Sequence, residues 1–351
     1  MAIKKILVLR FSAMGDMVLL VPVIRSLAAQ YPDVEITVVT RPKFASFFTD
    51  IDRVVPFPAD VDYTYSGIFG MRELFGKLMR RGPYDMVIDM HDHIRTILLR
   101  NLFKIFGTPV IIFEKGRPEK HAFTRKHNKN TDPLPHTVER YRLAFEKAGF
   151  PLRISSTPPH IFIKESAKEQ LKEWLLTNGI EKKETWIGIA PFARHVTKIW
   201  PLENYEPLMR KMIGKGPVKF FLFGGDKELK FFETLKKKFP DNTVIVAGQL
   251  KIKQELALIQ MLQLMVCVDS SNMHLASLMG TPLLSIWGGT DPDVGFGPWE
   301  KGPESIIQVS RDVLPCRPCS VYGKEKCFRG DFACLTSISP DYVFSRLEER
   351  L

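Results

Sequence analysis

The sequence predicts an α/β protein built from two doubly wound parallel sheets, and three observations support this fold class. Short apolar, β-branched runs alternate with amphipathic helical stretches in both halves of the chain. The 351 residues are too many for one ordinary hydrophobic core, so two domains are expected. The clearest stretch is 266–292, which reads as a strand, a polar turn, a helix ending at Gly280, a second strand and a Gly-rich loop.

The first half of the chain alternates as parallel α/β domains do. Runs of Val, Ile and Leu predict strands, and the amphipathic stretches between them predict helices, the first of which is closed by Tyr31-Pro32. The expected strands are residues 3–9, 35–40, 53–57, 84–90 and 109–113, and the expected helices are 17–30, 69–81 and 94–106. The alternation predicts one parallel, doubly wound sheet.

The second half repeats this arrangement. The expected strands are residues 186–190, 218–224, 243–247, 266–268 and 283–287, and the expected helices lie near 202–213, 227–238 and 254–264. The Pro-containing stretch 150–159 is the expected domain boundary, and Ser339 followed by Pro340 predicts the start of a final helix. Because ligands bind at the carboxyl ends of parallel strands, we expect a binding cleft where the two domains face each other.

Composition and charge narrow the class of partner. The formal net charge of +11 and the pI near 9.3 favour an anionic partner, which could be nucleic acid, a membrane surface or a phosphorylated substrate. No stretch reaches the roughly 18 apolar residues of a membrane span. The apolar start resembles a signal peptide only superficially, because Arg10, Asp16 and Pro22 interrupt it. We therefore expect a cytoplasmic protein.

The polar turn 269–272 is a candidate phosphate site. It precedes a helix whose first turn holds His274, and a helix N-terminus at the end of a parallel strand offers unpaired N–H groups and a positive dipole end. The alternative is that these side chains only cap the helix. The second polar loop, 288–291, one strand later favours a ligand site.

Three motifs in matching order carry a family resemblance. The stretches RFSAMGDMVLLVP, PFARHVTKIWPLENY and VDSSNMHLASLMGTPLLSIWG resemble glycosyltransferase family 9, the heptosyltransferases that build the inner core of lipopolysaccharide. The resemblance implies a GT-B fold with an acceptor-binding domain at 1–155, a donor-binding domain at 156–338 and a last helix, 339–351, that could return to the first domain. It also implies metal-independent, inverting transfer from ADP-heptose to an anionic, lipid-linked acceptor, with no cofactor, at the inner face of the cytoplasmic membrane. We expect no nucleic-acid partner, because the basic tract 114–129 lacks interleaved stacking aromatics apart from Phe123.

The same resemblance assigns roles to individual residues. Asp16 matches the general base, and it is also a plausible helix N-cap, which favours its ionised form. Lys198 would stabilise the leaving ADP in place of a metal. The other donor residues implied are Thr197, Glu228 (or its neighbour Asp226), Asp269, Ser270, Ser271 and His274. Ser271 stands where the family usually has Gly, which would strain the turn if that position needs a positive φ.

Two further features point to the acceptor. The basic tract 114–129 fits a substrate rich in carboxylate and phosphate, although such a charge run is usually a solvated, mobile loop. Its candidate acceptor contacts are Lys115, Arg117, Lys120 and Arg125, and the tract also holds Lys126 and Lys129. His91 and His93 follow a strand as an H-x-H pair, and with no third ligand evident such a pair more often only hydrogen-bonds locally. Because the family that the chain resembles is metal-independent, we expect His91 to contact acceptor rather than metal.

The chain contains five cysteines. Cys267 falls in an expected core strand. The other four, Cys316, Cys319, Cys327 and Cys334, are spaced C-x2-C-x7-C-x6-C and could be free thiols or hold zinc.

The alternatives for function are another nucleotide-sugar donor, epimerase or hydrolase chemistry on the same fold, and a non-catalytic nucleotide- or lipid-binding scaffold.

Overall fold

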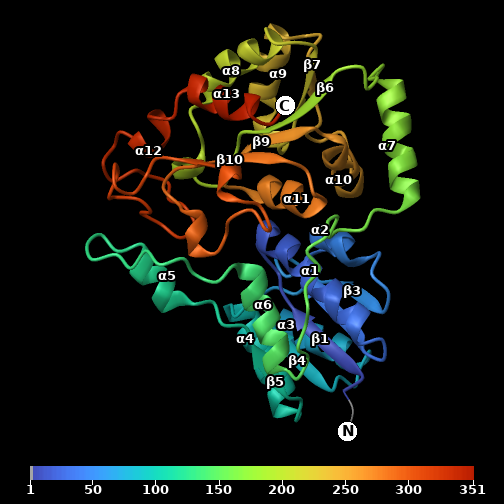
Figure 1. The fold of residues 1–351 in the computed structure, drawn as a ribbon. Helices are drawn as coiled ribbons and strands as arrows, with labels where there is room; N and C mark the ends of the chain where they lie inside the picture. The colour runs from blue at the N-terminus through green and yellow to red at the C-terminus, as the bar shows by residue number, and fades with distance from the viewer. Residues whose placement is uncertain (1–2) are drawn as a thin grey trace. The chain divides into compact units, whose positions relative to one another are not determined.

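A computed structural model describes residues 3–351, and the chain divides into two compact units (Figure 1). The first unit holds the chain up to Lys115 together with Thr137–Phe162, and the second holds Gly116–His136 together with Ile163–Leu351. Each unit is built around one parallel sheet, which confirms the predicted fold class. Among residues 3–351, no helix is both long enough and apolar enough to cross a bilayer.

The first unit contains a five-stranded sheet. Its strands are β1 (Lys5–Leu9), β2 (Glu35–Thr40), β3 (Val54–Pro58), β4 (Met86–Asp89) and β5 (Val110–Ile112). They lie in the order β3-β2-β1-β4-β5, and every neighbouring pair is parallel. The strand order therefore reverses between β1 and β4, and this switch point is where open α/β sheets bind ligands.

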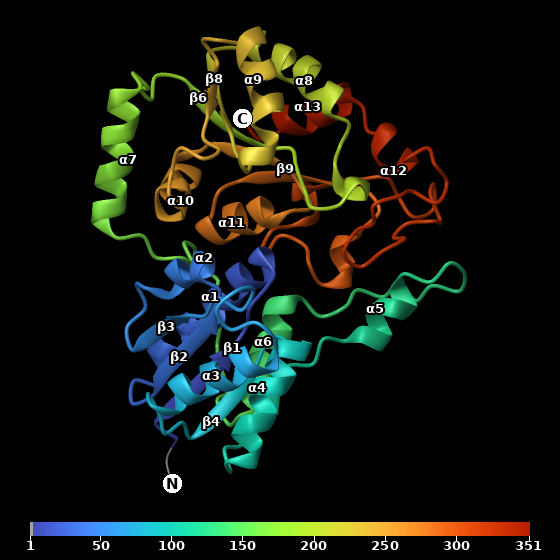
Figure 2. The same ribbon diagram turned by 180° about the vertical axis from the view of Figure 1, so that it is seen from behind.

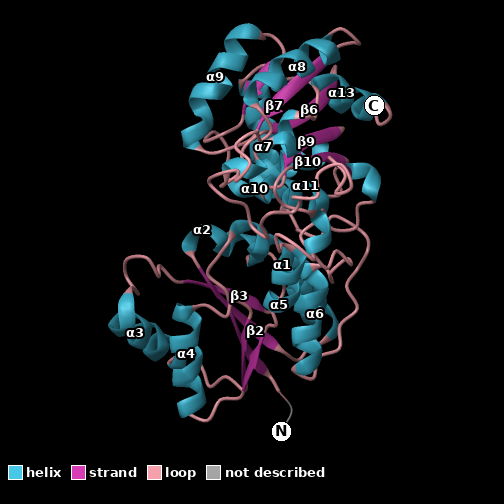
Figure 3. Ribbon diagram, turned by 90° about the vertical axis from the view of Figure 1, so that its left-hand side faces the viewer, coloured by secondary structure: helices cyan, strands magenta, loops and turns pink. Residues whose placement is uncertain are grey.

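Helices cover both faces of this sheet. They are α1 (Met14–Gln30), the short α2 (Pro42–Ala45), α3 (Gly67–Met79), α4 (Ile94–Ile105) and α6 (Thr137–Lys147). Helices α3 and α4 pack side by side on one face, and α1 and α6 pack together on the other (Figure 3). The buried core between α3, α4 and the sheet includes Leu74, Leu78, Leu99 and Phe103.

The second unit contains a six-stranded sheet. Its strands are β6 (Thr185–Ala190), β7 (Val218–Leu222), β8 (Thr243–Ile245), β9 (Leu264–Val268), β10 (Leu283–Trp287) and β11 (Ile306–Gln308). The order β11-β10-β9-β6-β7-β8 places the switch point between β6 and β9. Strand β11 was not expected from the sequence, because only three residues pair and two prolines lie shortly before it.

The helices of the second unit form two groups. They are α7 (Glu165–Thr177), α8 (Tyr205–Ile213), α9 (Leu229–Lys238), α10 (Ile252–Met261), α11 (Ser271–Met279), α12 (Ala333–Thr336) and α13 (Pro340–Glu348). Helix α10 packs against α7 and α11, and Figure 2 shows α10 and α11 side by side. Residues of α8, α9 and α13 bury a common core against the sheet. Helix α13 begins as predicted, because Ser339 is its N-cap and the Ser339 hydroxyl accepts a hydrogen bond from the backbone of Tyr342.

The compact units divide the chain differently from the boundaries at 155 and 338 expected from the sequence. The segment 151–162 stays with the first unit, because Arg25 and Gln30 of α1 donate hydrogen bonds to the carbonyls of Pro159 and Arg153. Helix α13 belongs to the second unit, where it packs on α8. The segment Gly116–His136, which includes α5 (Arg117–Phe123), also groups with the second unit.

Candidate functional site

Polar side chains gather at the switch point of the first unit. Residues 10–16 leave the carboxyl end of β1, and residues 91–93 leave the carboxyl end of β4, the neighbouring strand. Parallel pairing brings the two segments to one edge of the sheet. Asp16 and His91, both singled out from the sequence, lie on these two segments.

Asp16 is the third residue of α1. Its carboxylate accepts a hydrogen bond from the backbone of Ala13 at 3.3 Å. The expectation that Asp16 is the N-cap was wrong, because the helix begins earlier, at Met14, with Ala13 as its N-cap. Its Oδ1 atom lies 2.9 Å from a guanidinium nitrogen of Arg10 and 3.4 Å from the hydroxyl of Tyr141. The side chain keeps 25% of its surface exposed, so a hydroxyl group can approach it.

Arg10 is the buried cation that holds Asp16. Its guanidinium also donates to the carbonyl of Met90 and lies 5.3 Å from the centroid of the Tyr141 ring. Such fixed contacts restrain the carboxylate of Asp16 in one orientation. The sequence reasoning did not identify Arg10 as a site residue, although a charged residue directly after a buried strand is a usable signal.

His91 is buried at the same sheet edge rather than exposed. Its Nε2 atom lies 3.2 Å from the hydroxyl of Ser12, and its ring stacks on His93 at 5.1 Å between centroids. Burial, with the positive charges of Arg10 and Lys115, lowers the pKa of His91 to about 2, so the ring is neutral. Among the described residues, no group of three or more His, Cys, Asp or Glu side chains could hold a metal ion, and the H-x-H pair is therefore not part of such a site.

The candidate acceptor cations do not form one exposed cluster. Lys115, in the first unit, donates from its Nζ atom to the carbonyl of Asp92 at 3.1 Å. In the second unit, the buried Lys120 has its ammonium 4.2 Å from the centroid of the Phe296 ring. Arg117 and Arg125 are exposed.

The tract 114–129 is also more ordered than a solvated loop. Residues 117–123 form α5, and the Nζ atom of Lys129 donates to the carbonyls of Pro315, Arg317 and Pro318 at 2.7–3.1 Å. Three ammonium donors meeting three carbonyls explain why this end of the tract belongs to the second unit.

At the switch point of the second unit, Lys198 and Asp269 form an ion pair. Lys198 ends the short 3-10 helix η2 (Val196–Lys198) that follows β6, and Asp269 follows β9. The Nζ atom of Lys198 lies 2.9 Å from Oδ2 of Asp269, and the hydroxyl of Thr290 donates to the same oxygen at 2.7 Å. The structure therefore brings together two side chains that the sequence reasoning selected from separate motifs.

Thr197 is buried and its hydroxyl is occupied. The hydroxyl donates to the carbonyl of Lys324 and accepts from the Lys324 backbone N–H at 2.8 Å. The carbonyl of Thr197 accepts a hydrogen bond from the backbone of Gly289. Thr197 therefore fixes the Gly-rich loop 288–291 and the cysteine-rich segment 316–334 beside Lys198.

The turn after β9 presents a helix N-terminus. Ser270 is the N-cap of α11, Ser271 is its first residue and His274 is buried in its first turn. The hydroxyl of Ser270 is buried without a hydrogen-bond partner among the described residues. Ser271 is not among the non-glycine residues with positive φ, so the predicted strain at this position is absent. The backbone N–H groups of this turn can serve an anion.

Glu228 lies beside the same sheet edge, after β7. Its carboxylate accepts a hydrogen bond of 2.6 Å from the backbone of Gly225, which closes the 3-10 turn η4 (Asp226–Glu228). One carboxylate oxygen is therefore used locally. Its neighbour Asp226 is exposed.

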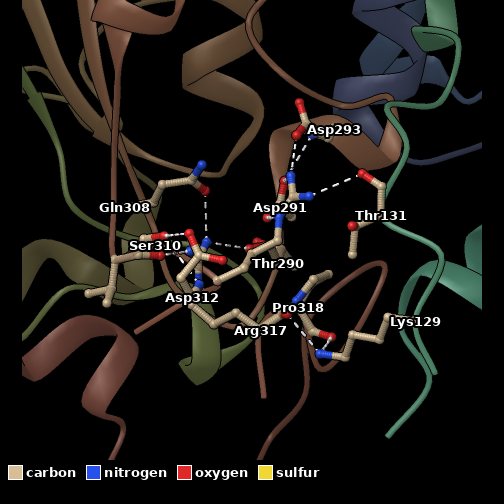
Figure 4. A network of polar contacts seen from close by, with 12 residues as sticks. Lys129, Thr131, Thr290, Asp291, Asp293, Gln308, Ser310, Asp312, Arg317 and Pro318 are labelled. Atoms are coloured by element: carbon tan, nitrogen blue, oxygen red, sulfur yellow. Dashed lines mark hydrogen bonds and ion pairs between the residues drawn. The ribbon is translucent and has the colours of Figure 1, made fainter. Parts of the chain in front are cut away.

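A polar network supports the Gly-rich loop 288–291 (Figure 4). The fully buried Arg317 donates to the carbonyls of Gly288 and Thr290 at 2.6 and 3.0 Å and to the side chain of Gln308 at 2.8 Å. Arg311 joins the buried Asp291 at 3.0 Å and donates to the carbonyl of Thr131 at 3.1 Å. The sequence reasoning missed both arginines, because they lie in an irregular segment with no helical or strand period.

The four clustered cysteines are free thiols in the structure, and they do not form a metal-binding group among the described residues. Burial raises the pKa of Cys334 to about 11 and also raises that of Cys319. Cys267 is buried in β9, as predicted.

Two Rossmann-type sheets, each with polar residues at its switch point, define a protein of the GT-B class. The model of glycosyltransferase family 9 (heptosyltransferase) matches residues 72–326. Lipooligosaccharide heptosyltransferase 2 of Haemophilus influenzae is 25% identical over 364 residues, which cover 99% of both chains.

Solved structures have the same fold. The family 9 glycosyltransferase of Veillonella parvula superimposes with a TM-score of 0.76 at 20% identity, covering 99% of this chain and 96% of that one. The Escherichia coli ADP-heptose lps heptosyltransferase II gives a TM-score of 0.69 at 20% identity over 98% of each chain. The chain belongs to glycosyltransferase family 9, and it is an enzyme of the heptosyltransferase type.

Proposed function

We propose that this glycosyltransferase moves a heptose from ADP-heptose to the inner core of lipopolysaccharide, with inversion at the anomeric carbon and without a metal. Family membership supports the reaction class. The donor is supported by the relative whose name specifies ADP-heptose. The observation that carries the proposal is the buried Lys198–Asp269 pair at the switch point of the second unit.

The groups around this ion pair would bind the donor. A diphosphate beside Lys198 and the N-terminus of α11 would meet an ammonium group, the positive end of a helix dipole and the hydroxyl of Ser270. Asp269 would accept hydrogen bonds from sugar hydroxyls. Thr197 would support this arrangement through its backbone contacts, while His274, Ser271 and the region of Glu228 complete the donor site.

Asp16 would act as the general base in the first unit. Its carboxylate takes the proton of an acceptor hydroxyl, that oxygen bonds to the anomeric carbon, and the bond from this carbon to the β-phosphate oxygen breaks with its electron pair leaving on ADP. Lys198 meets the charge that develops on the leaving phosphate. Arg10 holds the carboxylate of Asp16 in one orientation at 2.9 Å, and this positioning of the base would carry much of the effect.

We also propose which residues contact the acceptor and where in the cell the reaction takes place. The exposed Arg117 and Arg125 would contact carboxylates and phosphates of the lipid-linked acceptor, and Lys115 and His91 would shape its site. The acceptor would be presented at the inner face of the cytoplasmic membrane.

A donor panel tests the function. We would incubate the protein with ADP-heptose, GDP-, UDP- or CMP-sugars, with and without a Kdo-containing or heptosylated lipid A acceptor, and measure nucleotide release and product mass. We expect release from ADP-heptose only with acceptor, an added heptose in the opposite anomeric configuration, and no loss of rate in EDTA. Release without acceptor would indicate hydrolysis instead, and preference for another nucleotide would replace the donor.

A further inference from the structure

A group of exposed apolar side chains surrounds the N-termini of α3 and α4 in the first unit. Tyr63, Ile68, Phe69 and Ile94 are 82%, 70%, 88% and 61% exposed. Phe69 is the most exposed large apolar residue among those described. Exposed apolar side chains gathered in this way mark a binding surface more often than those scattered singly.

Ion pairs hold these residues together. The carboxylate of Asp62, next to Tyr63, lies 2.8 Å from the guanidinium of Arg41 and 3.2 Å from that of Arg95. Arg95 is the second residue of α4, so this bridge ties the turn before α3 to the first turn of α4. Helices α3 and α4 also pack side by side (Figure 3). We call Tyr63, Ile68, Phe69 and Ile94, with the surrounding cations, the α3–α4 tip.

The charge of the α3–α4 tip is positive. Its cations are Arg41, Lys43, Arg72 and Arg95, and its carboxylates are Asp60 and Asp62. Arg72 lies three and four residues after Phe69 and Ile68, so it shares their face of α3. The next carboxylate on α3, Glu73, is paired with Lys77 at 2.9 Å. Exposed apolar side chains next to cations complement an anionic lipid surface, because aromatic rings enter the headgroup layer and the cations contact lipid phosphates.

We propose that the α3–α4 tip docks the enzyme on an anionic phospholipid bilayer. The tip lies at the carboxyl end of the first-unit sheet, the edge that also carries Asp16 and His91. Docking there would keep the active-site edge of this unit near a lipid-linked acceptor. The inference deepens the proposed function by naming the partner surface, but binding to lipid needs neither donor nor acceptor.

Vesicle flotation of the full chain tests the docking surface. We would compare vesicles of about 30% phosphatidylglycerol in phosphatidylcholine with pure phosphatidylcholine, using the wild type and the double variant Ile68→Ser/Phe69→Ser. The matched control is Ile105→Ser/Phe106→Ser, since these residues are 77% and 63% exposed at the other end of α4. We expect at least a tenfold loss of affinity for the anionic vesicles in the tip variant and less than a twofold change in the control.

Substitutions of single cations test how much of the vesicle binding is electrostatic. Lys43→Gln and Arg72→Gln should each weaken anionic-vesicle binding about fivefold, with a smaller effect at high salt, whereas Lys104→Gln near the end of α4 should not. Equal losses in the tip and control variants, or no vesicle binding by the wild type, would overturn the proposal. A tip variant that lost self-association in light scattering while wild-type vesicle binding was absent would assign the surface to a second copy of the chain.

The proposed function can fail or hold separately from this inference. Transfer to a water-soluble acceptor without acyl chains reports the chemistry alone. The tip variant should keep that activity, and it should lose activity only toward acceptor embedded in vesicles.

Discussion

The Nζ atom of Lys198 lies 2.9 Å from Oδ2 of Asp269, and both side chains are largely buried. The pair joins the segments that follow β6 and β9, which are neighbours in the sheet. The residue proposed for the donor phosphate is therefore held by the residue proposed for the donor sugar. A diphosphate that enters must share Lys198 with Asp269.

This sharing predicts opposite effects for two substitutions. Asp269→Asn keeps an oxygen for the hydroxyl of Thr290 but removes the charge that neutralises Lys198. We expect ADP affinity to stay the same or to rise, while transfer falls about a hundredfold because the sugar is no longer held. Lys198→Ala should weaken ADP binding roughly ten- to a hundredfold. Titration calorimetry with ADP and a turnover assay would measure both. A loss of ADP affinity in Asp269→Asn as large as that in Lys198→Ala would contradict the shared role.

Asp16→Asn tests the general base. The amide preserves the shape and the contact with Arg10 but cannot accept the proton, so turnover should fall by roughly 10²–10⁴-fold with ADP affinity unchanged. The control is Asp33→Asn, an exposed carboxylate of the same unit, which should behave as wild type. Wild-type turnover in Asp16→Asn would remove this residue from the mechanism.

The sequence was sufficient for the fold class and for most of the strands, and tertiary contacts explain what it missed. Alternating strands and helices predicted both parallel sheets apart from β11, because most of the other strands are predominantly apolar. The polar turn after β9 was located from the strand end, whereas Asp16 after β1 and Lys198 after β6 were assigned through the family resemblance. Arg311 and Arg317 could not be assigned from the sequence, since their roles depend on carbonyls far away in the chain.

The basic tract 114–129 is a second case in which the sequence does not reveal the tertiary contacts. Four of its six cations, Lys115, Arg117, Lys120 and Arg125, were candidate acceptor contacts. The structure separates the six cations, because Lys120 and Lys129 are held against the second unit whereas Arg125 is exposed. Only tertiary contacts distinguish a packing lysine from one that faces solvent.

His91 predicts a pH dependence of stability. Its pKa is about 2 in the folded protein and 6.5 when unfolded, so the unfolded chain binds more protons between these values. Stability is therefore fully present above about pH 6.5 and is lost as the pH falls, at about 1.4 kcal/mol per pH unit for this group. We expect His91→Gln to flatten the fall in free energy of unfolding between about pH 6.5 and 5, measured by urea denaturation. The exposed His127→Gln is the control, and an equal slope in all three proteins would refute the prediction.

Arg317 predicts a stability effect that lysine cannot rescue. Its guanidinium serves several acceptors of the Gly-rich loop and strand β11 while it is 1% exposed. Arg317→Met leaves these buried acceptors without donors and should cost about 3 kcal/mol or more in the free energy of unfolding. Arg317→Lys should recover little, because one ammonium cannot reproduce the planar fork. Arg329→Met removes an exposed, solvent-screened ion pair with Asp331 and should leave the free energy of unfolding close to that of the wild type.

The last prediction separates structural from acceptor-binding cations in the basic tract. Lys129→Ala removes the donor to three carbonyls of the cysteine-rich segment, so limited proteolysis within residues 116–136 should become faster. Arg125→Ala should leave proteolysis unchanged but raise KM for an anionic acceptor about three- to tenfold, with a weaker dependence of KM on salt. Faster cleavage in Arg125→Ala with unchanged KM would show that this arginine is structural, and the acceptor would then have to be recognised elsewhere.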